Sequence, residues 1–305
     1  MNGIKGLKNQ AIFLASLLTV GSTVSIASTA NAVTLKVTVE NLTPENGGVV
    51  TPVWFGFHDG SFDSFNIGES ASSGIEALAE DAITGLEATV PGLVESFIEL
   101  GLDPNDVPPQ SSLIAGLFAD SAAAQNGGVQ GIVVDLDSPL GLFSGDVVST
   151  KIKLDEDLAS NSFFSYGAMY FPSNDAFIAN DNPIAIFDGD GKFIGADFIV
   201  LGDQVWDAGT EVNDENPLNV PFDLAVVGDG IDENGLVLPH PGFLPAGSGG
   251  VLDFGDGLFA NADFTTPGFQ VARITIEKVP EPATITGLLL LGGLSILRRR
   301  VGRSR

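Results

Sequence analysis

Hydrophobic and polar residues alternate along several short segments of this chain, which is the pattern of half-buried β-strands. In segment 33–42 (VTLKVTVENL), Leu35, Val37 and Val39 fall on one face, and the polar residues between them fall on the other. Further strands are predicted, from alternation or from runs of β-branched and aromatic residues, at 49–57, 132–136, 147–154, 163–171, 184–187, 198–201, 222–227 and 272–278.

Helical spacing of apolar residues is clearest in segment 70–82 (SASSGIEALAEDA). There Ile75, Leu78 and Ala79 share one face, and the serines before them are good N-caps. Segment 93–100 fits either a short helix or a strand. Short strands separated by turns dominate the chain, which has 38 glycines in 305 residues. The pattern therefore predicts an all-β fold, an antiparallel β-sandwich with one or two short helices in its connections, rather than a βαβ fold.

The beginning of the chain has the pattern of an export signal. Two lysines precede an apolar core at 11–20, which is too short to span a bilayer. Ala30 and Ala32 then supply the small residues of a cleavage site. We therefore predict a signal peptide over residues 1–32 and a mature body that begins at Val33.

The segment 280–305 contains three elements in order. Pro280-Glu281-Pro282 is followed by an apolar stretch at 283–297 of marginal membrane-spanning length, and then by three arginines, which stay on the cytoplasmic side. This segment resembles the PEP-CTERM sorting signals of bacterial exported proteins, with an ordinary tail anchor as the alternative. The resemblance implies processing by an exosortase-type enzyme. We expect an exported protein, secreted or at the cell surface, that contacts the membrane only through this transient C-terminal helix.

The body between these ends, residues 33–279, is strongly acidic. It contains 38 acidic and six basic residues, a net charge of −32. Such a balance argues against nucleic-acid partners, which need Lys and Arg against phosphates, and against direct binding to anionic lipid. The chain has no cysteine, which excludes thiol catalysis and disulfides. It has only two histidines, too few for a His-rich metal site. Most carboxylates are expected to be solvated, and the charge favours cations or basic partners.

Two acidic loops contain the candidate chemistry. Asp175 follows the predicted strand 163–171 and lies among apolar residues, so its carboxylate must be solvated, paired or bound to a cation. Segment 205–215 (VWDAGTEVNDE) supplies Asp207 and Glu211 around a glycine. Loop carboxylates are ligands that Ca²⁺ prefers, and two loops at one end of a sandwich can hold such an ion between them. The alternative is that Asp175 caps backbone amides in a solvated turn.

Four motifs occur in order along the body: PVW with FHDG at 52–60, SASSGIEALAED at 70–81, PSND at 172–175, and WDAGTE at 206–211. Together they resemble the spondin domain of F-spondin-like matrix proteins and of many bacterial exported proteins. The resemblance implies a C2-like sandwich of eight antiparallel strands with a bound Ca²⁺, whose ligands here would be Asp175, Asp207 and Glu211. Glu211 stands where the family has a second Asp, which keeps the charge but lengthens the side chain by one methylene.

Other acidic or histidine-containing segments are interpreted as structural. DGDGK at 188–192 lacks the later ligands of an EF-hand loop and is predicted to be a tight hairpin turn. GDGIDENG at 228–235 is predicted to be a plain turn, with a weak second cation site as the alternative. His58 is interpreted as a turn residue, and Glu76 with Glu80 as the solvated face of a helix, because no nucleophile or acid–base constellation accompanies them.

These observations favour a binding or structural module rather than an enzyme. The expected function is that of an exported Ca²⁺-binding β-sandwich with an adhesive role, with extracellular polysaccharide or matrix proteins as partners. The adhesive role follows from the spondin resemblance alone, since a fold does not fix a function. The alternatives are a carbohydrate-binding or carbohydrate-active extracellular protein, and a C2-like lipid binder with a bridging Ca²⁺, which the net charge disfavours.

Overall fold

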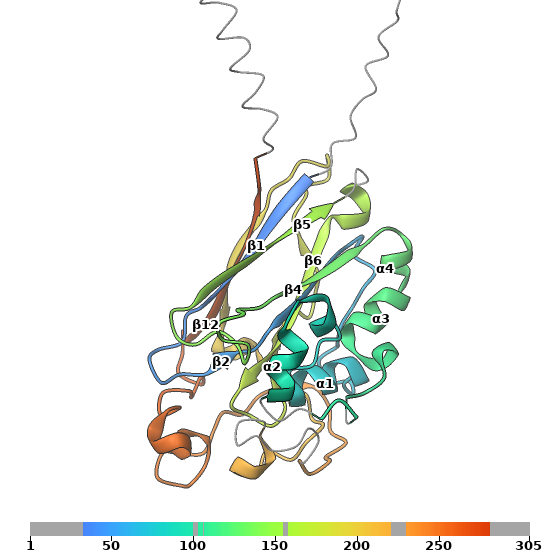
Figure 1. The fold of residues 1–305 in the computed structure, drawn as a ribbon. Helices are drawn as coiled ribbons and strands as arrows, with labels where there is room; N and C mark the ends of the chain where they lie inside the picture. The colour runs from blue at the N-terminus through green and yellow to red at the C-terminus, as the bar shows by residue number, and fades with distance from the viewer. Residues whose placement is uncertain (1–32, 100–102, 106, 155–157, 221–229, 281–305) are drawn as a thin grey trace, which may run out of the picture. The chain divides into compact units, whose positions relative to one another are not determined.

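Two antiparallel sheets packed on one another form the framework of the protein (Figure 1). The computed structural model describes residues 33–99, 103–105, 107–154, 158–220 and 230–280. The predicted signal peptide, the predicted sorting signal beyond its first residue, and the predicted strand 222–227 lie outside these residues. The predicted antiparallel, sandwich-like arrangement is confirmed.

The smaller sheet has four strands in the order β5–β1–β12–β9, and each neighbouring pair is antiparallel. Its strands are β5 (Val147–Leu154), β1 (Val33–Asn41), β12 (Gln270–Lys278) and β9 (Ala196–Leu201). Just beyond the central pair, the backbone N–H of Val279 donates to the carbonyl of Thr34 at 2.8 Å. The first and last strands of the described residues therefore lie side by side (Figure 1).

The larger sheet has eight strands in the order β11–β10–β7–β6–β3–β4, with β2 and β8 also paired to β6. Its strands are β2 (Val49–Val50), β3 (Val53–His58), β4 (Val129–Val133), β6 (Phe163–Phe171), β7 (Ala176–Ala179), β8 (Ile184–Ala185), β10 (Val205–Asp207) and β11 (Leu238–Pro239). β6 is the hub of this sheet, because four other strands pair with it.

The main core lies between the two sheets. The predicted alternation of β1 is confirmed, since Leu35, Val37 and Val39 are buried and the residues between them are partly exposed. These side chains belong to one cluster with Phe55 and Tyr166 of the larger sheet. Removal of this contiguous apolar surface from water is the main force that holds the sheets together.

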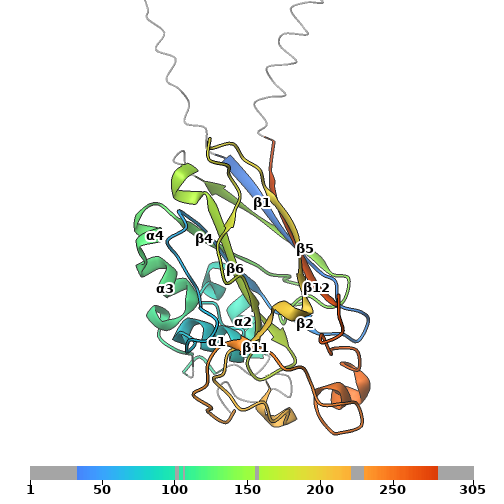
Figure 2. The same ribbon diagram turned by 180° about the vertical axis from the view of Figure 1, so that it is seen from behind.

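Four α-helices of the described residues cover the outer face of the larger sheet, on the side away from the smaller sheet (Figures 1 and 2). They are α1 (Ser73–Asp81), α2 (Leu93–Glu99), α3 (Ile114–Asp120) and α4 (Ala122–Gln125). Trp54 and Phe177 point outward from the sandwich and share a second apolar cluster with Ile114 and Phe118 of α3. The prediction of one or two helices was wrong, because the larger sheet is apolar on both faces and needs a second covering layer.

The connections contain further short elements. Segments of 3₁₀-helix lie at Glu87–Thr89, Gln110–Ser112, Leu158–Asn161, Gly202–Gln204, Pro217–Asn219 and Val251–Gly257. The predicted strand 49–57 divides into β2 and β3 before Pro52, which has no N–H for the ladder. Segment 93–100 forms helix α2. Strands β7, β10 and β11 were not predicted, because two to four residues carry no clear period.

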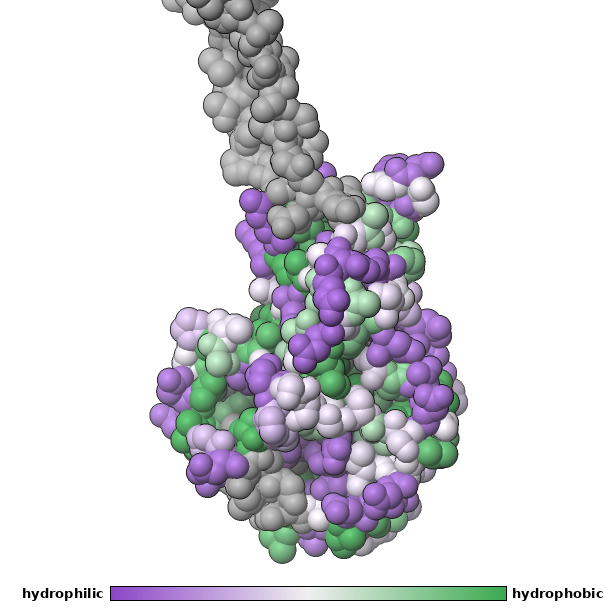
Figure 3. All heavy atoms as spheres, turned by 90° about the vertical axis from the view of Figure 1, so that its right-hand side faces the viewer, coloured by the Kyte–Doolittle hydropathy of each residue, from purple (hydrophilic) through white to green (hydrophobic). Residues whose placement is uncertain are grey.

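The described surface is mixed in polarity. On the face shown in Figure 3, hydrophobic residues form small groups among hydrophilic ones. The smaller sheet carries both ion pairs of the described residues, Lys36–Glu277 at 2.8 Å and Arg273–Asp197 at 2.6 Å. No helix in the described part of the chain is both long and apolar enough to cross a membrane.

Candidate metal centre

Strands β6, β7 and β10 bring Asp175 and Asp207 together. Asp175 ends the turn between β6 and β7, and Asp207 is the last residue of β10. β7 pairs with β10 in antiparallel register, with Asp207 opposite Ala176. The backbone N–H of Ala208 extends this ladder by donating to the Asp175 carbonyl at 3.1 Å. The two carboxylates are therefore neighbours in space because their strands are neighbours in the sheet.

The carboxylate of Asp175 is fully buried and only half satisfied. Its Oδ2 accepts hydrogen bonds from the backbone N–H groups of Thr210 at 3.0 Å and Glu211 at 3.2 Å. Its Oδ1 is buried without a hydrogen-bond partner. Asp175 thus caps backbone amides, as one interpretation predicted, but it is buried rather than solvated. An unpartnered buried oxygen destabilises the fold by about 1–3 kcal/mol, so this atom calls for a ligand.

Asp207 organises the loop that follows β10. Its Oδ1 accepts from the backbone N–H of Gly209 at 2.7 Å, and its Oδ2 accepts from the side-chain amide of Asn213 at 2.6 Å. Gly209 has φ +66°, and a Cβ there would lie 2.7 Å from the backbone nitrogen of Leu236. Glycine is therefore required both for the backbone conformation and for the close approach.

Glu211 is buried against a second acidic loop. The backbone N–H of Gly230 donates to its carboxylate, and a Cβ at Gly230 would collide with that group. The backbone N–H of Glu233 donates to the Thr210 carbonyl at 2.8 Å. The prediction of a plain turn at 228–235 was incomplete, because its described part runs along the loop that contains Glu211.

A fourth carboxylate, Glu80, joins the cluster and was not among the predicted site residues. It is half-buried in the last turn of α1 and lies close to Thr210, whose hydroxyl donates to Oδ2 of Asp175 at 3.5 Å. Glu76, one turn earlier, is exposed. The interpretation of both residues as a solvated face is therefore correct for Glu76 and wrong for Glu80. One feature of the sequence could have pointed to Glu80: the last turn of the predicted helix is acidic, and negative charge is unfavourable at a helix C-terminus.

Burial and mutual repulsion raise the pKa values of these carboxylates. Burial first, and the charge of Asp207 second, raise the pKa of Asp175 from 3.8 to about 7. Burial, followed by the charges of Glu80 and Asp175, raises the pKa of Glu211 from 4.5 to about 8. Burial is also the main cause for Glu80, whose pKa rises from 4.5 to about 8. A positive charge among them would favour the ionised forms.

The chemistry of this cluster fits a hard cation. Its donors are oxygens, and Ca²⁺ takes six to eight oxygen ligands. Oδ1 of Asp175 is free, and carboxylate oxygens that already accept one hydrogen bond keep a second lone pair. Neither ion pair of the described residues involves the cluster. However, no three His, Asp or Glu side chains of the described residues converge closely enough to hold a metal ion. The predicted ligands share one neighbourhood without forming a finished coordination shell.

His58 lies in a buried polar network rather than in an exposed turn. Its Nδ1 accepts from the backbone N–H of Gly60 at 3.1 Å, which assigns the ring proton to Nε2. Nε2 lies 3.0 Å from Oγ of Ser165 and therefore donates to it. Burial lowers the pKa of His58 from 6.5 to about 4. Because the ring donates to Ser165, it cannot act as the base that removes the serine proton. The pair therefore serves as a hydrogen-bonded link between β3 and β6.

The predicted tight turn at 188–192 is confirmed. The backbone N–H of Asp188 donates to the Lys192 carbonyl at 2.9 Å. Oδ1 of Asp188 accepts from the backbone N–H groups of Asp190 at 3.1 Å and Lys192 at 2.8 Å. The Asp188 carboxylate thus stabilises its own turn.

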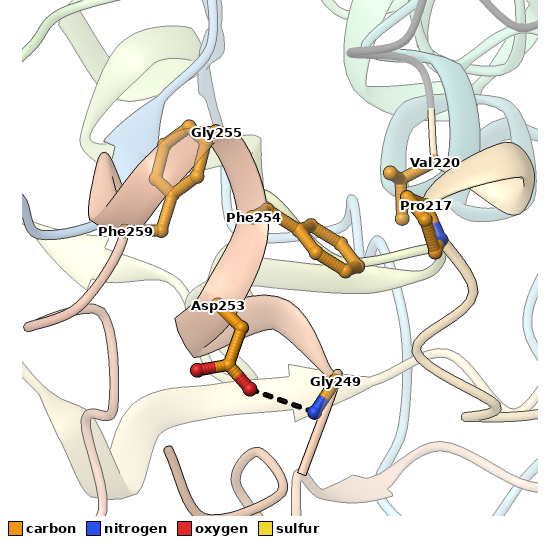
Figure 4. A pocket seen from close by; sticks show the side chains of 7 residues that line it. All are labelled: Pro217, Val220, Gly249, Asp253, Phe254, Gly255 and Phe259. Atoms are coloured by element: carbon orange, nitrogen blue, oxygen red, sulfur yellow. Dashed lines mark hydrogen bonds between the residues drawn. The ribbon is translucent and has the colours of Figure 1, made fainter. Parts of the chain in front are cut away.

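A hollow of about 420 Å³ lies apart from the carboxylate cluster (Figure 4). The ring of Phe254 points across it toward Pro217 and Val220. Asp253 is the charged residue of the lining, but its carboxylate turns to the backbone N–H of Gly249, at 2.7 Å. The hollow therefore presents a mainly apolar wall, and its acidic group serves to hold the adjacent loop.

No family model matches the chain, and no curated protein matches it. The spondin resemblance therefore rests on its four motifs and stays a prediction.

Proposed function

We propose that this protein is an exported Ca²⁺-binding β-sandwich of C2-like type with an adhesive or extracellular-matrix role. Asp175 carries the proposal, because it is a fully buried carboxylate with an unpartnered oxygen beside Asp207 and Glu211. Asp175, Asp207 and Glu211 would hold the ion. A bound Ca²⁺ would supply the positive charge that lets these carboxylates ionise together.

The hydrogen bonds around the cluster explain how the chain prepares it. Two backbone amides hold Oδ2 of Asp175 and thereby orient Oδ1. Asn213 and Gly209 hold the carboxylate of Asp207. Such support of a ligand by neighbouring groups is a regular part of metal sites. The rigid strands β7 and β10 set the separation between the two loops.

The role outside the cell rests on the sequence motifs. The predicted signal peptide and the PEP-CTERM-like tail support export, with an exosortase-type enzyme as a processing partner. The spondin-like motifs support extracellular polysaccharide or matrix proteins as binding partners. The acidic body supports dependence on a divalent cation, since like-charged surfaces repel unless a cation lies between them.

Retention on matrix material tests this proposal. The full-length chain is passed over beads coated with the exopolysaccharide fraction of the producing cells, in millimolar Ca²⁺ or in EDTA. Asp207→Asn removes one predicted ligand, and Asp190→Asn removes one charge from the turn at 188–192 as a control. We expect Ca²⁺-dependent retention of the parent and of Asp190→Asn, and its loss in Asp207→Asn. Equal retention of all three proteins with and without Ca²⁺ would refute the proposal.

A carbohydrate-binding role without Ca²⁺ is the second candidate, and one hollow favours it. A space of about 360 Å³ is lined by Asp203, Thr265, Thr266 and His240 among other residues. Nδ1 of His240 accepts from the backbone N–H of Gly242 at 3.1 Å, so Nε2 carries the proton, and it is buried without a partner. Hydroxyl groups of a sugar match this polar lining. Ca²⁺-independent retention that is lost in Thr265→Val would favour this function over the first.

A further inference from the structure

The hollow of about 420 Å³ in Figure 4 has an apolar wall that stays partly open to solvent. The ring of Phe254 is half-exposed, and Pro217, toward which it points, is exposed. Large apolar side chains next to the lining in the sequence are exposed as well, since Leu218 is 62% exposed and Leu258 is 39% exposed. Exposed apolar side chains that gather around a hollow are typical of a binding site.

The backbone at Phe254 departs from regular geometry. Phe254 is extended, with ψ 147°, and interrupts the 3₁₀ segment Val251–Gly257. Gly255 and Asp256 follow in the left-handed region, with φ 57° and 56°. This conformation is unfavourable for a residue with a side chain, and such strain tends to occur at binding sites. Phe254 therefore extends from a break in the segment and not from the face of a continuous helix.

Two carboxylates hold the loop that carries Phe254. Oε1 of Glu215 accepts from the backbone N–H of Leu244 at 2.5 Å, and its Oε2 accepts from that of Val251 at 2.8 Å. Oδ2 of Asp253 accepts from the backbone N–H of Gly249 at 2.7 Å. The walls of the hollow are thus fixed before a ligand arrives, which lowers the entropic cost of binding.

The charge of the hollow is negative and lacks a cation from the described residues. Asp253 is the charged residue of the lining, and it takes part in neither ion pair of the described residues. The basic residues of the body all belong to the smaller sheet or to the turn at 188–192: Lys36, Lys151, Lys153, Arg273, Lys278 and Lys192. The hollow therefore combines an aromatic, apolar wall with a carboxylate whose counter-ion must come from outside.

An arginine side chain matches this combination better than other side chains do. A purely apolar side chain would remove water from the Asp253 carboxylate without replacing its hydrogen bonds. Lysine supplies a charge but has no flat face. Arginine has an apolar stem that suits Pro217 and Val220, a flat guanidinium that stacks on an aromatic ring, and N–H groups that suit a carboxylate.

We propose that this hollow is a docking site for an arginine side chain of a basic partner protein, with Phe254 as the stacking surface and Asp253 as the counter-ion. The inference goes beyond the proposed function, because it requires no cation at Asp175. The net charge of −32 attracts any basic molecule, whereas the hollow selects for one kind of side chain.

Calorimetric titration of the full-length chain in EDTA and about 0.15 M salt tests the proposal, since this salt screens general attraction. The probes are two acetylated hexapeptides of equal charge, with either two arginines or two lysines among glycines. We expect the parent to bind the arginine peptide about five- to tenfold more tightly than the lysine peptide. Phe254→Leu keeps an apolar side chain without the ring and should reduce this preference to less than about twofold. Ile199→Ala, at an exposed apolar position of β9, is the control and should retain the preference.

Asp253→Asn and Asp256→Asn test the counter-ion. Both remove one exposed carboxylate from the same loop, but Asp253 alone of the two lines the hollow. We expect Asp253→Asn to weaken binding of the arginine peptide by about fivefold or more, and Asp256→Asn by less than about twofold. Phe254→Leu leaves the hydrogen bonds of Asp253 in place, so it decides the question even if Asp253→Asn opens the loop.

Three results would overturn the proposal. Equal affinity of the parent for the two peptides would show general attraction to an acidic surface. A preference for arginine that survives in Phe254→Leu would place the contact elsewhere. Binding of the neutral sugar cellohexaose that is lost in Phe254→Leu, without any preference for arginine, would assign the hollow to a sugar ring. Because EDTA removes divalent cations, none of these results bears on the proposed Ca²⁺ site.

Discussion

Replacement of Asp175 by asparagine removes a buried charge while it leaves the local hydrogen bonds in place. The amide oxygen can accept from Thr210 and Glu211, as Oδ2 of Asp175 does at 3.0 and 3.2 Å. The amide nitrogen then takes the place of Oδ1, which has no partner, and it no longer repels Asp207. We therefore expect Asp175→Asn to be more stable than the parent when Ca²⁺ is absent.

The size of this effect follows from the pKa of Asp175. A rise from 3.8 to about 7 is a shift of roughly three pH units, and each unit corresponds to about 1.4 kcal/mol. At about pH 8 the ionised carboxylate therefore lowers the free energy of unfolding by about 4 kcal/mol if the loops stay rigid. Relaxation of the loops and entry of water reduce this amount. We expect the variant to gain about 2–4 kcal/mol in EDTA.

Ca²⁺ should stabilise the parent and not the variant. At a free concentration about a hundred times the Kd, a ligand that binds only the folded state adds about 2.7 kcal/mol. Urea unfolding at about pH 8, followed by the fluorescence of Trp54 and Trp206, measures both quantities in EDTA and in Ca²⁺. Asp190→Asn, in the exposed turn at 188–192, is the control and should follow the parent under both conditions.

Two results would refute this reasoning. If Asp175→Asn is less stable than the parent in EDTA, the Asp175 carboxylate stabilises the metal-free fold. The repulsion between Asp175 and Asp207, which a cation is expected to relieve, would then be absent. If Ca²⁺ stabilises the parent, Asp175→Asn and Asp190→Asn by the same amount, the ion acts by general screening of an acidic surface.

The stability that Asp175→Asn gains over the parent in EDTA should grow from about pH 5 to about pH 8. Asp175 in the folded parent keeps its proton until about pH 7, whereas the unfolded chain releases that proton near pH 3.8, so the parent alone loses stability across this range. Thermal unfolding at several pH values measures the difference, and a difference that shrinks with rising pH would contradict the prediction. His58 acts with the opposite sign: its folded pKa of about 4 lies below the unfolded value of 6.5, so its contribution to stability is lost as the pH falls through this window. His58→Gln should therefore flatten the acid limb of the stability profile in urea titrations, and an unchanged slope would contradict this. Gly230→Ala puts a methyl group against the Glu211 carboxylate and should lower the free energy of unfolding by about 1–3 kcal/mol. Gly189→Ala is the control, because a methyl group there meets open space and should change the free energy of unfolding little. Urea unfolding compares the two variants, and equal effects would show that Gly230 is not in tight contact with Glu211.

Much of the sandwich was predictable because its long strands leave a clear signature. β1 alternates over nine residues, and β6 is a nine-residue run rich in aromatic residues. The short strands of the site leave no such signature. β7 (AFIA) is buried at every position, and β10 (VWD) is too short to show a period. Their conformation depends on pairing with segments distant in the sequence, which local pattern does not reveal.

The candidate site divides in a similar way. Asp175, Asp207 and Glu211 were predicted from two short motifs, and the pairing of β7 with β10 accounts for their proximity. Glu80 was missed because its spacing from Glu76 is that of a solvated helix face. Only the position of α1 over β7 and β10 shows which of the two glutamates turns inward. That position depends on the order of strands in the sheet, which the sequence does not state.

The pairing of β1 with β12 determines when this protein can fold. The two strands form the centre of the smaller sheet, with Lys36 opposite Glu277, yet they lie at opposite ends of the described chain. Closure of so long a loop carries an entropic cost, and contacts of high sequence separation form slowly. A nascent chain has no partner for this side of β1 until nearly all of the body has been synthesised. The smaller sheet can therefore be completed only late, when the last strand of the body is available to pair with β1.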